Sequence, residues 1–381
     1  MKKIRKAIAA LAAFAAMTLP AGTIYAAPEE FVLGVVTPLS GSSAVSGAIL
    51  ENAAQMAVDE INENGGINGE IPIKLVAEDD EAIPATSVTA VQKLVEQEKV
   101  NAVIGSQPSS CTIANMKITE AAGIPQITPA SSNISITQSG NEFIYRMTAT
   151  DATNAKTLLK YASEYMGAKK FAMLYESSDF GTGGFKIVKE LCGEYGLEMA
   201  DSEVYNAGDT DFSVALAKMY SKDVDFFFFW GYHTEVAMIC NQMTQYGIKV
   251  PVIGYGFNSP ELTELGGAAV ENITFCTSFD SANQDEKVQA FDKKYQELFK
   301  SGYDQNAPQC YDAVYLIADA VERCIADGKD WSDGTVLNEY ISAANYDGAT
   351  GNTQFDDDGE MIKDLIIVKI EDGEHVIVDW Q

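Results

Sequence analysis

The sequence predicts an α/β protein of two lobes, each built on a doubly wound parallel sheet with helices on both faces. Three observations predict this fold class. Strand-like and helix-like runs alternate along most of the chain, the alternation occurs in two successive series, and 381 residues suffice for two domains. The hydrophobic content of 46% is enough to fill two cores.

The first series contains four predicted strands. The helix after the first strand carries small and apolar residues at helical spacing and ends at Gly65-Gly66, a pair suited to a C-terminal cap. In chain order the predicted elements are strand 31–38, helix 46–66, strand 71–80, helix 84–99, strand 101–106, helix 109–123 and strand 124–130.

The second series begins near residue 150. Its elements are helix 153–167, strand 169–177, helix 183–196, strand 197–206, helix 211–222, strand 224–232, helix 234–247 and strand 250–257. The run FFFFW at 226–230 could form an aromatic platform. However, a central strand covered on both faces is apolar at every position, which favours a buried strand.

The rhythm changes after residue 276. Two long helices are predicted at 285–302 and 307–328. The chain then ends in a predicted hairpin at 364–380, whose turn is marked by Asp372-Gly373.

Residues 1–26 have the features of a cleaved secretory signal peptide. A basic start precedes an apolar stretch at 7–19 and a small-residue end, with cleavage expected after Ala26. The alternative, a membrane anchor, needs roughly 18 apolar residues, and the stretch at 7–19 is shorter than that. The signal peptide predicts a protein outside the cytoplasmic membrane, either in the periplasm or on the outside of a Gram-positive cell. No cysteine stands at the cleavage point to accept a lipid, which favours the periplasm.

The mature chain is strongly acidic. Removal of Lys2, Lys3, Arg5 and Lys6 with the signal takes the formal net charge from −29 to −33. Such a charge repels nucleic acid and anionic lipid, so we expect neither as a partner.

The six cysteines are far apart and include no CxxC pair. Export permits disulfides, but spacing does not give their pairing, and several cysteines lie in apolar helical contexts. Disulfides and buried free thiols both remain open.

No catalytic or metal motif is apparent. His233 and His375 are the only histidines, no Gly-rich segment carries a P-loop lysine, and the sequence around Ser43 lacks the second glycine of a nucleophile elbow. We therefore expect no enzyme, metal or cofactor. An extracellular hydrolase is the alternative from a different functional class, because carboxylates are plentiful.

Small polar residues follow three predicted strands of the first lobe, at 40–47, 106–112 and 130–135. Ligands of open α/β sheets bind at the carboxyl ends of strands, where helix starts can hold a carboxylate without a basic residue. Each segment alone could be an ordinary helix cap. Together they favour a site for a small carboxylate-bearing molecule.

In the order and spacing of several segments, the mature chain resembles the periplasmic substrate-binding proteins of branched-chain amino acid ABC transporters, the leucine/isoleucine/valine type. The segments are PLSG at 38–41, DEINENGGING at 59–69, LVAEDDEAIPATSVTAVQKLV at 75–95, VIGS at 103–106, GIPQITPASSN at 123–133, DFSVALAKM at 211–219, YDAVYLIADAVE at 311–322 and TGNTQFDDDGE at 350–360.

The resemblance implies the type I periplasmic-binding-protein fold, with a hinge of three crossovers. It places lobe 1 at 27–148 and 277–353 and lobe 2 at 149–276 and 354–381. It also implies a ligand in the interlobe cleft, closure on binding and delivery to a membrane permease by a monomer.

The resemblance also implies roles for individual residues. The ligand carboxylate would meet the hydroxyl of Ser109 and the turn Ala130, Ser131 and Ser132. Tyr232 would lie near the ammonium group, and Phe180 would close over the ligand.

Two positions depart from the family pattern. Gly256 stands where amino acid binders commonly carry a glutamate that pairs with the ammonium group, and Ser46 replaces an aromatic residue. A buried ammonium without a partner is costly, so either Glu176, Asp179 or Glu235 takes over, or the ligand is not a simple aliphatic amino acid. Ser42 and Ser46 would line the side-chain end of the pocket.

The predicted function is therefore capture of a small carboxylate-bearing ligand, an amino acid above all. The alternatives on the same fold are a receptor for urea, short amides or aromatic acids, and a ligand sensor.

Overall fold

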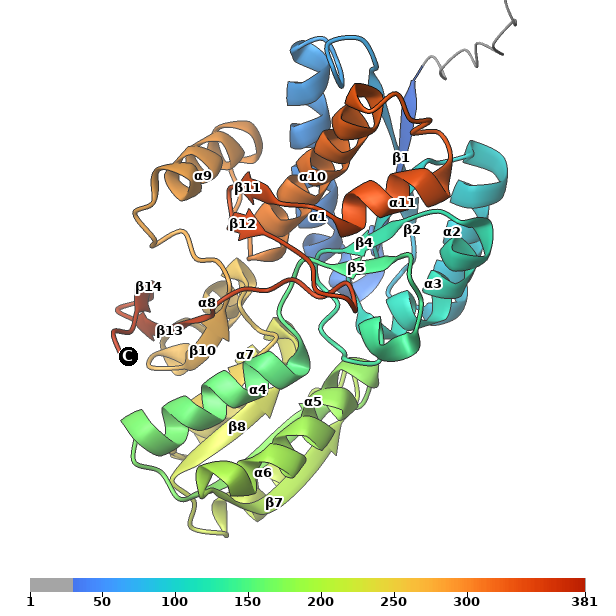
Figure 1. Ribbon diagram of the computed structural model, residues 1–381. Coiled ribbons are helices and arrows are strands. Elements are labelled where there is room, and N and C mark those ends of the chain that lie inside the picture. The colour runs from blue at the N-terminus through green and yellow to red at the C-terminus, as the bar shows by residue number, and fades with distance from the viewer. Residues whose placement is uncertain (1–29, 381) are drawn as a thin grey trace, which may run out of the picture.

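The computed structural model describes residues 30–380 and has two lobes (Figure 1). The predicted signal peptide lies outside the described residues. Among residues 30–380, no helix has both the length and the apolar character needed to cross a membrane.

The first lobe is built on a five-stranded parallel sheet with the order β2-β1-β3-β4-β5. The strand order reverses at β1, because β2 is added on one side of it and β3 on the other, and open sheets of this type bind ligands at such a point. The strands are β1 (Phe31–Thr37), β2 (Ile73–Asp79), β3 (Ala102–Gly105), β4 (Gln126–Thr128) and β5 (Ile144–Arg146).

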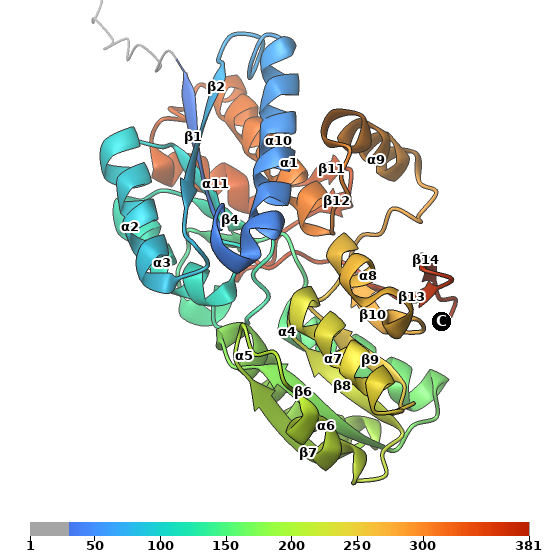
Figure 2. The same cartoon turned by 180° about the vertical axis from the view of Figure 1, so that it is seen from behind.

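Helices cover both faces of this sheet (Figures 1 and 2). One face packs on α1 (Ala44–Glu63), α10 (Asn306–Ala326) and α11 (Gly334–Ser342), which together form the main core of the lobe. The other face packs on α2 (Pro84–Lys93) and α3 (Ser109–Ala122). Residues 306–342, which include α10 and α11, thus return to the first lobe.

The second lobe repeats the design with a seven-stranded sheet in the order β14-β13-β10-β9-β8-β6-β7. The strands are β6 (Lys170–Glu176), β7 (Glu198–Tyr205), β8 (Phe226–Trp230), β9 (Val252–Tyr255), β10 (Thr274–Thr277), β13 (Ile366–Glu371) and β14 (Glu374–Ile377). The pairs β10-β13 and β13-β14 are antiparallel, and the other pairs of this sheet are parallel.

One face of the second sheet packs on α4 (Asp151–Lys160) and α5 (Asp179–Leu191), and the other packs on α6 (Ser213–Tyr220), α7 (His233–Gln245) and α8 (Pro260–Gly266). The remaining elements are α9 (Glu286–Phe299), the small pair β11 (Tyr346–Gly348) and β12 (Gly351–Thr353), and short turns at Gly41–Ser43, Leu94–Glu98, Thr137–Ser139, Tyr161–Tyr165, Cys192–Tyr195 and Gly267–Val270.

The aromatic run of β8 is a buried strand, which confirms that prediction. All five residues are buried; Phe226, Phe228 and Trp230 pack in the core under α4 and α5, while Phe227 and Phe229 pack in the opposite core. The side chains of β8 therefore pack against the helices on both faces of the sheet.

The predicted hairpin is β13-β14. Its turn residues Asp372 and Gly373 have φ values of 54° and 81°, as a two-residue type I′ turn requires. The structure also decides between the two cysteine alternatives, because all six thiols are buried and free.

Three segments connect the lobes: 147–150 between β5 and α4, 278–285 between β10 and α9, and 354–365 between β12 and β13. These are the three crossovers expected from the resemblance. The boundaries placed at 148, 276 and 353 stay a prediction.

Candidate ligand-binding cleft

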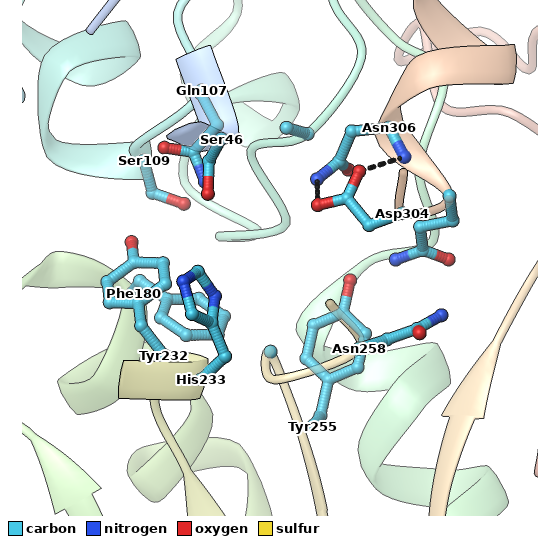
Figure 3. Close-up of a pocket in the computed structure, with 13 residues that line it drawn as sticks. Ser46, Gln107, Ser109, Phe180, Tyr232, His233, Tyr255, Asn258, Asp304 and Asn306 are labelled. Carbon is cyan, nitrogen blue, oxygen red and sulfur yellow. Dashed lines mark hydrogen bonds between the residues drawn. The ribbon is translucent and has the colours of Figure 1, made fainter. Parts of the chain in front are cut away.

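A pocket lies between the two lobes, at the carboxyl ends of strands from both sheets (Figure 3). It encloses about 530 Å³ of empty space, part of it open solvent, and we call it the central pocket. The first lobe contributes Ser46, Gln107, Ser109, Ala130, Asp304, Gln305 and Asn306, and the second contributes Phe180, Tyr232, His233, Tyr255, Gly256 and Asn258. Small-molecule sites commonly lie at such interfaces between domains.

The topology explains why these residues meet. Ser46 follows β1 in the first turn of α1, Ser109 follows β3 as the first residue of α3, and Ala130 follows β4. In the second lobe, Phe180, Tyr232 and Gly256 follow β6, β8 and β9 in the same way. Equivalent strand ends of the two sheets thus face each other across the pocket.

The start of α3 offers hydrogen-bond donors. Pro108 precedes the helix in an extended conformation, so the first N–H groups of α3 have no carbonyl partner within the helix. The Ser109 oxygen accepts the Asn133 N–H at 3.4 Å, which leaves the hydroxyl proton free to donate. Together with the helix dipole, these groups suit a carboxylate.

Ala130 is the only residue of the predicted Ala130–Ser132 turn that lines the central pocket. The Ser131 hydroxyl lies 2.8 Å from the Thr112 hydroxyl and 3.1 Å from the Ser106 carbonyl oxygen, so it joins loops within the lobe. The Ser132 hydroxyl is buried and has no hydrogen-bond partner among the described residues. The structure does not bring either serine to the pocket.

Aromatic side chains form the second-lobe wall. The ring of Phe180 lies 5.1 Å from that of Tyr232 and 6.0 Å from that of Tyr255. Burial, reinforced by the Glu176 carboxylate, raises the pKa of Tyr232 well above its usual value. Tyr232 therefore faces the pocket as a neutral hydroxyl.

Gly256 cannot carry a side chain in this arrangement. Its φ is +95°, and a Cβ atom would lie 2.4 Å from the Phe180 ring and 2.7 Å from the Gly231 carbonyl oxygen. The absence of a glutamate at position 256, which was expected to leave the ligand ammonium group without its usual counter-charge, thus has a steric explanation. Phe180 occupies the space that a glutamate would need.

Asp304 supplies an acid that sequence reasoning missed. It is 7% exposed, and its carboxylate accepts hydrogen bonds from the Asn306 backbone N–H at 2.9 Å and the Asn306 side-chain amide at 3.0 Å (Figure 3). Within residues 30–380 it forms no ion pair with a basic side chain. Burial raises the pKa of Asp304 to about 7.

Comparison with known proteins identifies the family. The family model described as periplasmic binding protein matches residues 30–374. The chain belongs to the periplasmic binding protein family. The resemblance drawn from sequence is thereby confirmed, including its type I fold.

Three relatives of this periplasmic binding protein illustrate the likeness. The leucine-, isoleucine-, valine-, threonine- and alanine-binding protein of Pseudomonas aeruginosa is 30% identical over 91% of this chain and 92% of its own length. The solved structure of LivJ from Streptococcus pneumoniae with isoleucine is 31% identical, with coverage of 92% and 99% and a TM-score of 0.83. That of the leucine-binding protein LivK from Thermotoga maritima is 26% identical, with coverage of 92% and 98% and a TM-score of 0.83.

Two of the three predicted substitute acids, Glu176 and Glu235, lie beside the central pocket rather than in it. Both are buried and line a neighbouring cavity. Asp179 lines neither cavity, but its carbonyl oxygen accepts the Asn133 amide at 2.5 Å, a contact between the lobes. Ser42 belongs to the turn Gly41–Ser43, and its side chain lies outside the described part of the chain.

Sequence reasoning missed several residues that line the pocket of this periplasmic binding protein: Gln107, His233, Tyr255, Asn258, Asp304, Gln305 and Asn306. Gln107 could have been found, because it stands within the small-residue segment 106–112. Residues 304–306 precede α10, far along the chain from the other pocket residues, and no local pattern marks them.

His233 has a partner within its own lobe. Its Nε2 contacts the Glu261 carboxylate, and burial lowers the pKa of the imidazole although this carboxylate raises it. As a periplasmic binding protein, the chain is a ligand-binding component of a transport system and not an enzyme, as the sequence predicts.

Proposed function

We propose that this protein captures an α-amino acid in the central pocket and delivers it to the membrane permease of an ABC transporter. One observation carries the proposal. The pocket offers uncharged donors at the start of α3 and a buried carboxylate, Asp304, elsewhere on the same lobe (Figure 3). These groups complement the carboxylate and the ammonium group of an amino acid.

The carboxylate of the ligand would accept hydrogen bonds from the Ser109 hydroxyl and the first N–H groups of α3. Hydrogen bonds to a charged group contribute roughly 1.5–3 kcal/mol each. Three of them would cover a good part of the roughly 8 kcal/mol that a micromolar affinity requires.

The ammonium group of the ligand would pair with Asp304. This carboxylate is buried without a cation among the described residues, which costs free energy until a positive group arrives. We therefore assign to Asp304 the role that was expected, from the sequence alone, of Glu176, Asp179 or Glu235.

The named relatives support this ligand class. The Pseudomonas aeruginosa relative is called a binding protein for five amino acids, and the Streptococcus pneumoniae structure holds isoleucine. Aromatic acids and short amides, the alternatives on this fold, offer no ammonium group to Asp304. A sensor would use the same pocket and differ only in its membrane partner.

Binding would close the lobes around the ligand. Donors and the acid come from the first lobe, and the aromatic wall comes from the second, so a bound ligand stabilises the closed arrangement about the three connections. The permease would recognise this closed form. The predicted signal peptide would place the monomeric protein outside the cytoplasmic membrane.

Thermal unfolding tests the proposal. The mature chain, 27–381, is unfolded and refolded to remove carried-over ligand and then melted with single amino acids, aromatic acids, urea and amides. A ligand at 100 times its Kd adds about 2.7 kcal/mol of stability. We expect at least one α-amino acid to raise the melting temperature by several degrees; a shift with aromatic acids or amides alone would contradict the proposal.

A further inference from the structure

A second cavity adjoins the central pocket. Four residues line both: Ser46, Gln107, Tyr232 and His233. In Figure 3 these residues stand at the end of the pocket away from Asp304. We call this space the side cavity. It holds about 1200 Å³ of empty space, part of it open solvent, and both lobes contribute its walls.

The walls of the side cavity are acidic and hydroxyl-rich. Its lining is Ser40, Gly41, Ser43, Ser46, Glu81, Ala82, Ile83, Gln107, Pro108, Ser110, Glu176, Ser178, Ala207, Tyr232, His233, Thr234 and Glu235. Neither cavity contains a lysine or arginine in its lining. The one imidazole, that of His233, already faces Glu261.

Two of the acids are buried. Glu176 is 3% exposed and Glu235 is 8% exposed. Glu176 accepts the Ser178 N–H at 2.9 Å and the Ser177 hydroxyl at 3.4 Å, and Glu235 accepts the Gly208 N–H at 2.9 Å. Within residues 30–380, neither carboxylate forms an ion pair with a basic side chain. Their charges are therefore supported only by neutral donors.

Besides burial, the two carboxylates raise the pKa of neighbouring tyrosines. Burial, with Glu235 and Glu176 adding to it, raises the pKa of Tyr205 well above its usual value, and the same two acids act on Tyr232. In addition, the Ser178 hydroxyl oxygen is buried and has no hydrogen-bond partner among the described residues. The side cavity therefore combines a negative field with an unused hydroxyl.

We infer that the ligand is an α-amino acid whose side chain runs past Ser46 and Tyr232 into the side cavity and ends in a cationic group held by Glu176 and Glu235. This inference rests on the function proposed above, because it takes the α-carboxylate and α-ammonium groups to be bound in the central pocket. The aliphatic side chain of leucine would leave both buried carboxylates without a cation.

Isothermal titration calorimetry on the refolded mature chain tests the inference with matched ligands. Arginine is compared with citrulline, its neutral isostere, and lysine is compared with norleucine, which lacks the terminal ammonium group. We expect at least one cationic ligand to bind at least tenfold more tightly than its neutral counterpart and more tightly than leucine.

Two isosteric variants, Glu176→Gln and Glu235→Gln, test the assigned residues. Each should reduce the affinity for the cationic ligand at least tenfold and change that for the neutral counterpart by less than threefold. Glu190→Gln is the control, because it removes the same charge from an exposed position of α5 in the same lobe. It should leave both affinities within threefold of the original values.

The two proposals fail in different ways. If leucine or isoleucine binds and no cationic ligand exceeds its neutral counterpart, the inference is overturned while the proposed function stands. The inference is also overturned if a cationic ligand binds preferentially but neither glutamine variant reduces that preference. If no α-amino acid binds, the proposed function itself fails.

Discussion

At the scale of single residues, Asp304 should make the ligand affinity of the pocket depend on pH. Its ligand-free pKa of about 7 results from burial, and a bound ammonium group would lower it again. Ligand binding near pH 7 therefore requires Asp304 to lose its proton. The affinity should be full above pH 7 and decline as the pH falls through this range.

Replacement of this acid gives the first prediction. Asp304→Asn removes the charge but keeps the shape, so it should weaken amino acid binding about tenfold to a hundredfold, the value of a charged hydrogen bond of roughly 1.5–3 kcal/mol. The decline of affinity below pH 7 should also disappear. Calorimetric titrations between pH 5.5 and 8.5 measure both effects. An unchanged pH profile in the variant would show that another group is responsible.

Gly256 gives a second prediction at this scale. Gly256→Ala introduces a Cβ atom at 2.4 Å from the Phe180 ring, on a backbone with φ of +95°. The variant should lose about 1–3 kcal/mol of stability from strain and overpacking. Urea unfolding measures the loss. Gly267→Ala, which has positive φ but no atom within 4 Å of the new Cβ, serves as the control for backbone strain alone.

At the scale of elements, the N-terminus of α3 is the feature that recognises a carboxylate. Ser109→Ala removes one charge-assisted hydrogen bond, so amino acid affinity should fall about tenfold to a hundredfold. The ligand-free melting temperature should change little, since the hydroxyl accepts only one long bond of 3.4 Å. Thr89→Ala, which removes an exposed hydroxyl from α2 in the same lobe and lines neither cavity, is the control, and calorimetry compares the two. Equal losses in both variants would argue against the assigned role.

The prediction of helices and strands from the sequence succeeded where a regular pattern of apolar residues extends over a long stretch of the chain. The strands and helices between residues 31 and 130 and between 153 and 257 were predicted because apolar runs alternate there with helical spacing. Strands β5, β10, β11 and β12 and helices α8 and α11 lie outside these two stretches, where the regular alternation is interrupted, and they were missed. Asp304 was missed for a different reason. It reaches the pocket through the crossover back to the first lobe, and a polar loop gives no sign of such a long-range contact.

The site was predicted as far as topology could take it. Ser46, Ser109 and Ala130 lie in the three segments that follow first-lobe strands, whereas Phe180, Tyr232 and Gly256 were expected from the resemblance, and all six line the pocket. Ser131 and Ser132 do not, because both side chains are buried within the lobe, where the Ser131 hydroxyl contacts Thr112. Their binding roles were expected from resemblance and not from geometry.

At the scale of the whole molecule, buried acids couple stability to pH. Burial raises the pKa of both Asp151 and Asp304 to about 7, above the ordinary value of 3.8, and Arg146 only partly offsets this at Asp151. The unfolded chain releases these protons near pH 4, whereas the folded protein keeps them until about pH 7. Their contribution to stability is therefore full below pH 4 and is lost as the pH rises through 7.

This coupling predicts the behaviour of the ligand-free protein. Between pH 5 and pH 8, the original protein should lose about 3 kcal/mol of stability relative to Asp151→Asn, since roughly 1.4 kcal/mol is lost for each pH unit between pH 5 and the folded-state pKa of about 7. Urea unfolding of both proteins at the two pH values measures this difference. A difference that stays constant would mean that Asp151 does not titrate in this range.

A crystal structure of the mature chain with the tightest-binding amino acid of the panel would test the proposed recognition of an α-amino acid in a single experiment. We predict a closed cleft, a ligand carboxylate within hydrogen-bond distance of the Ser109 hydroxyl, and an ammonium group within the same distance of the Asp304 carboxylate. An α-ammonium group bound instead to Glu176 or Glu235, or a ligand outside the central pocket, would show that the proposed binding mode is wrong.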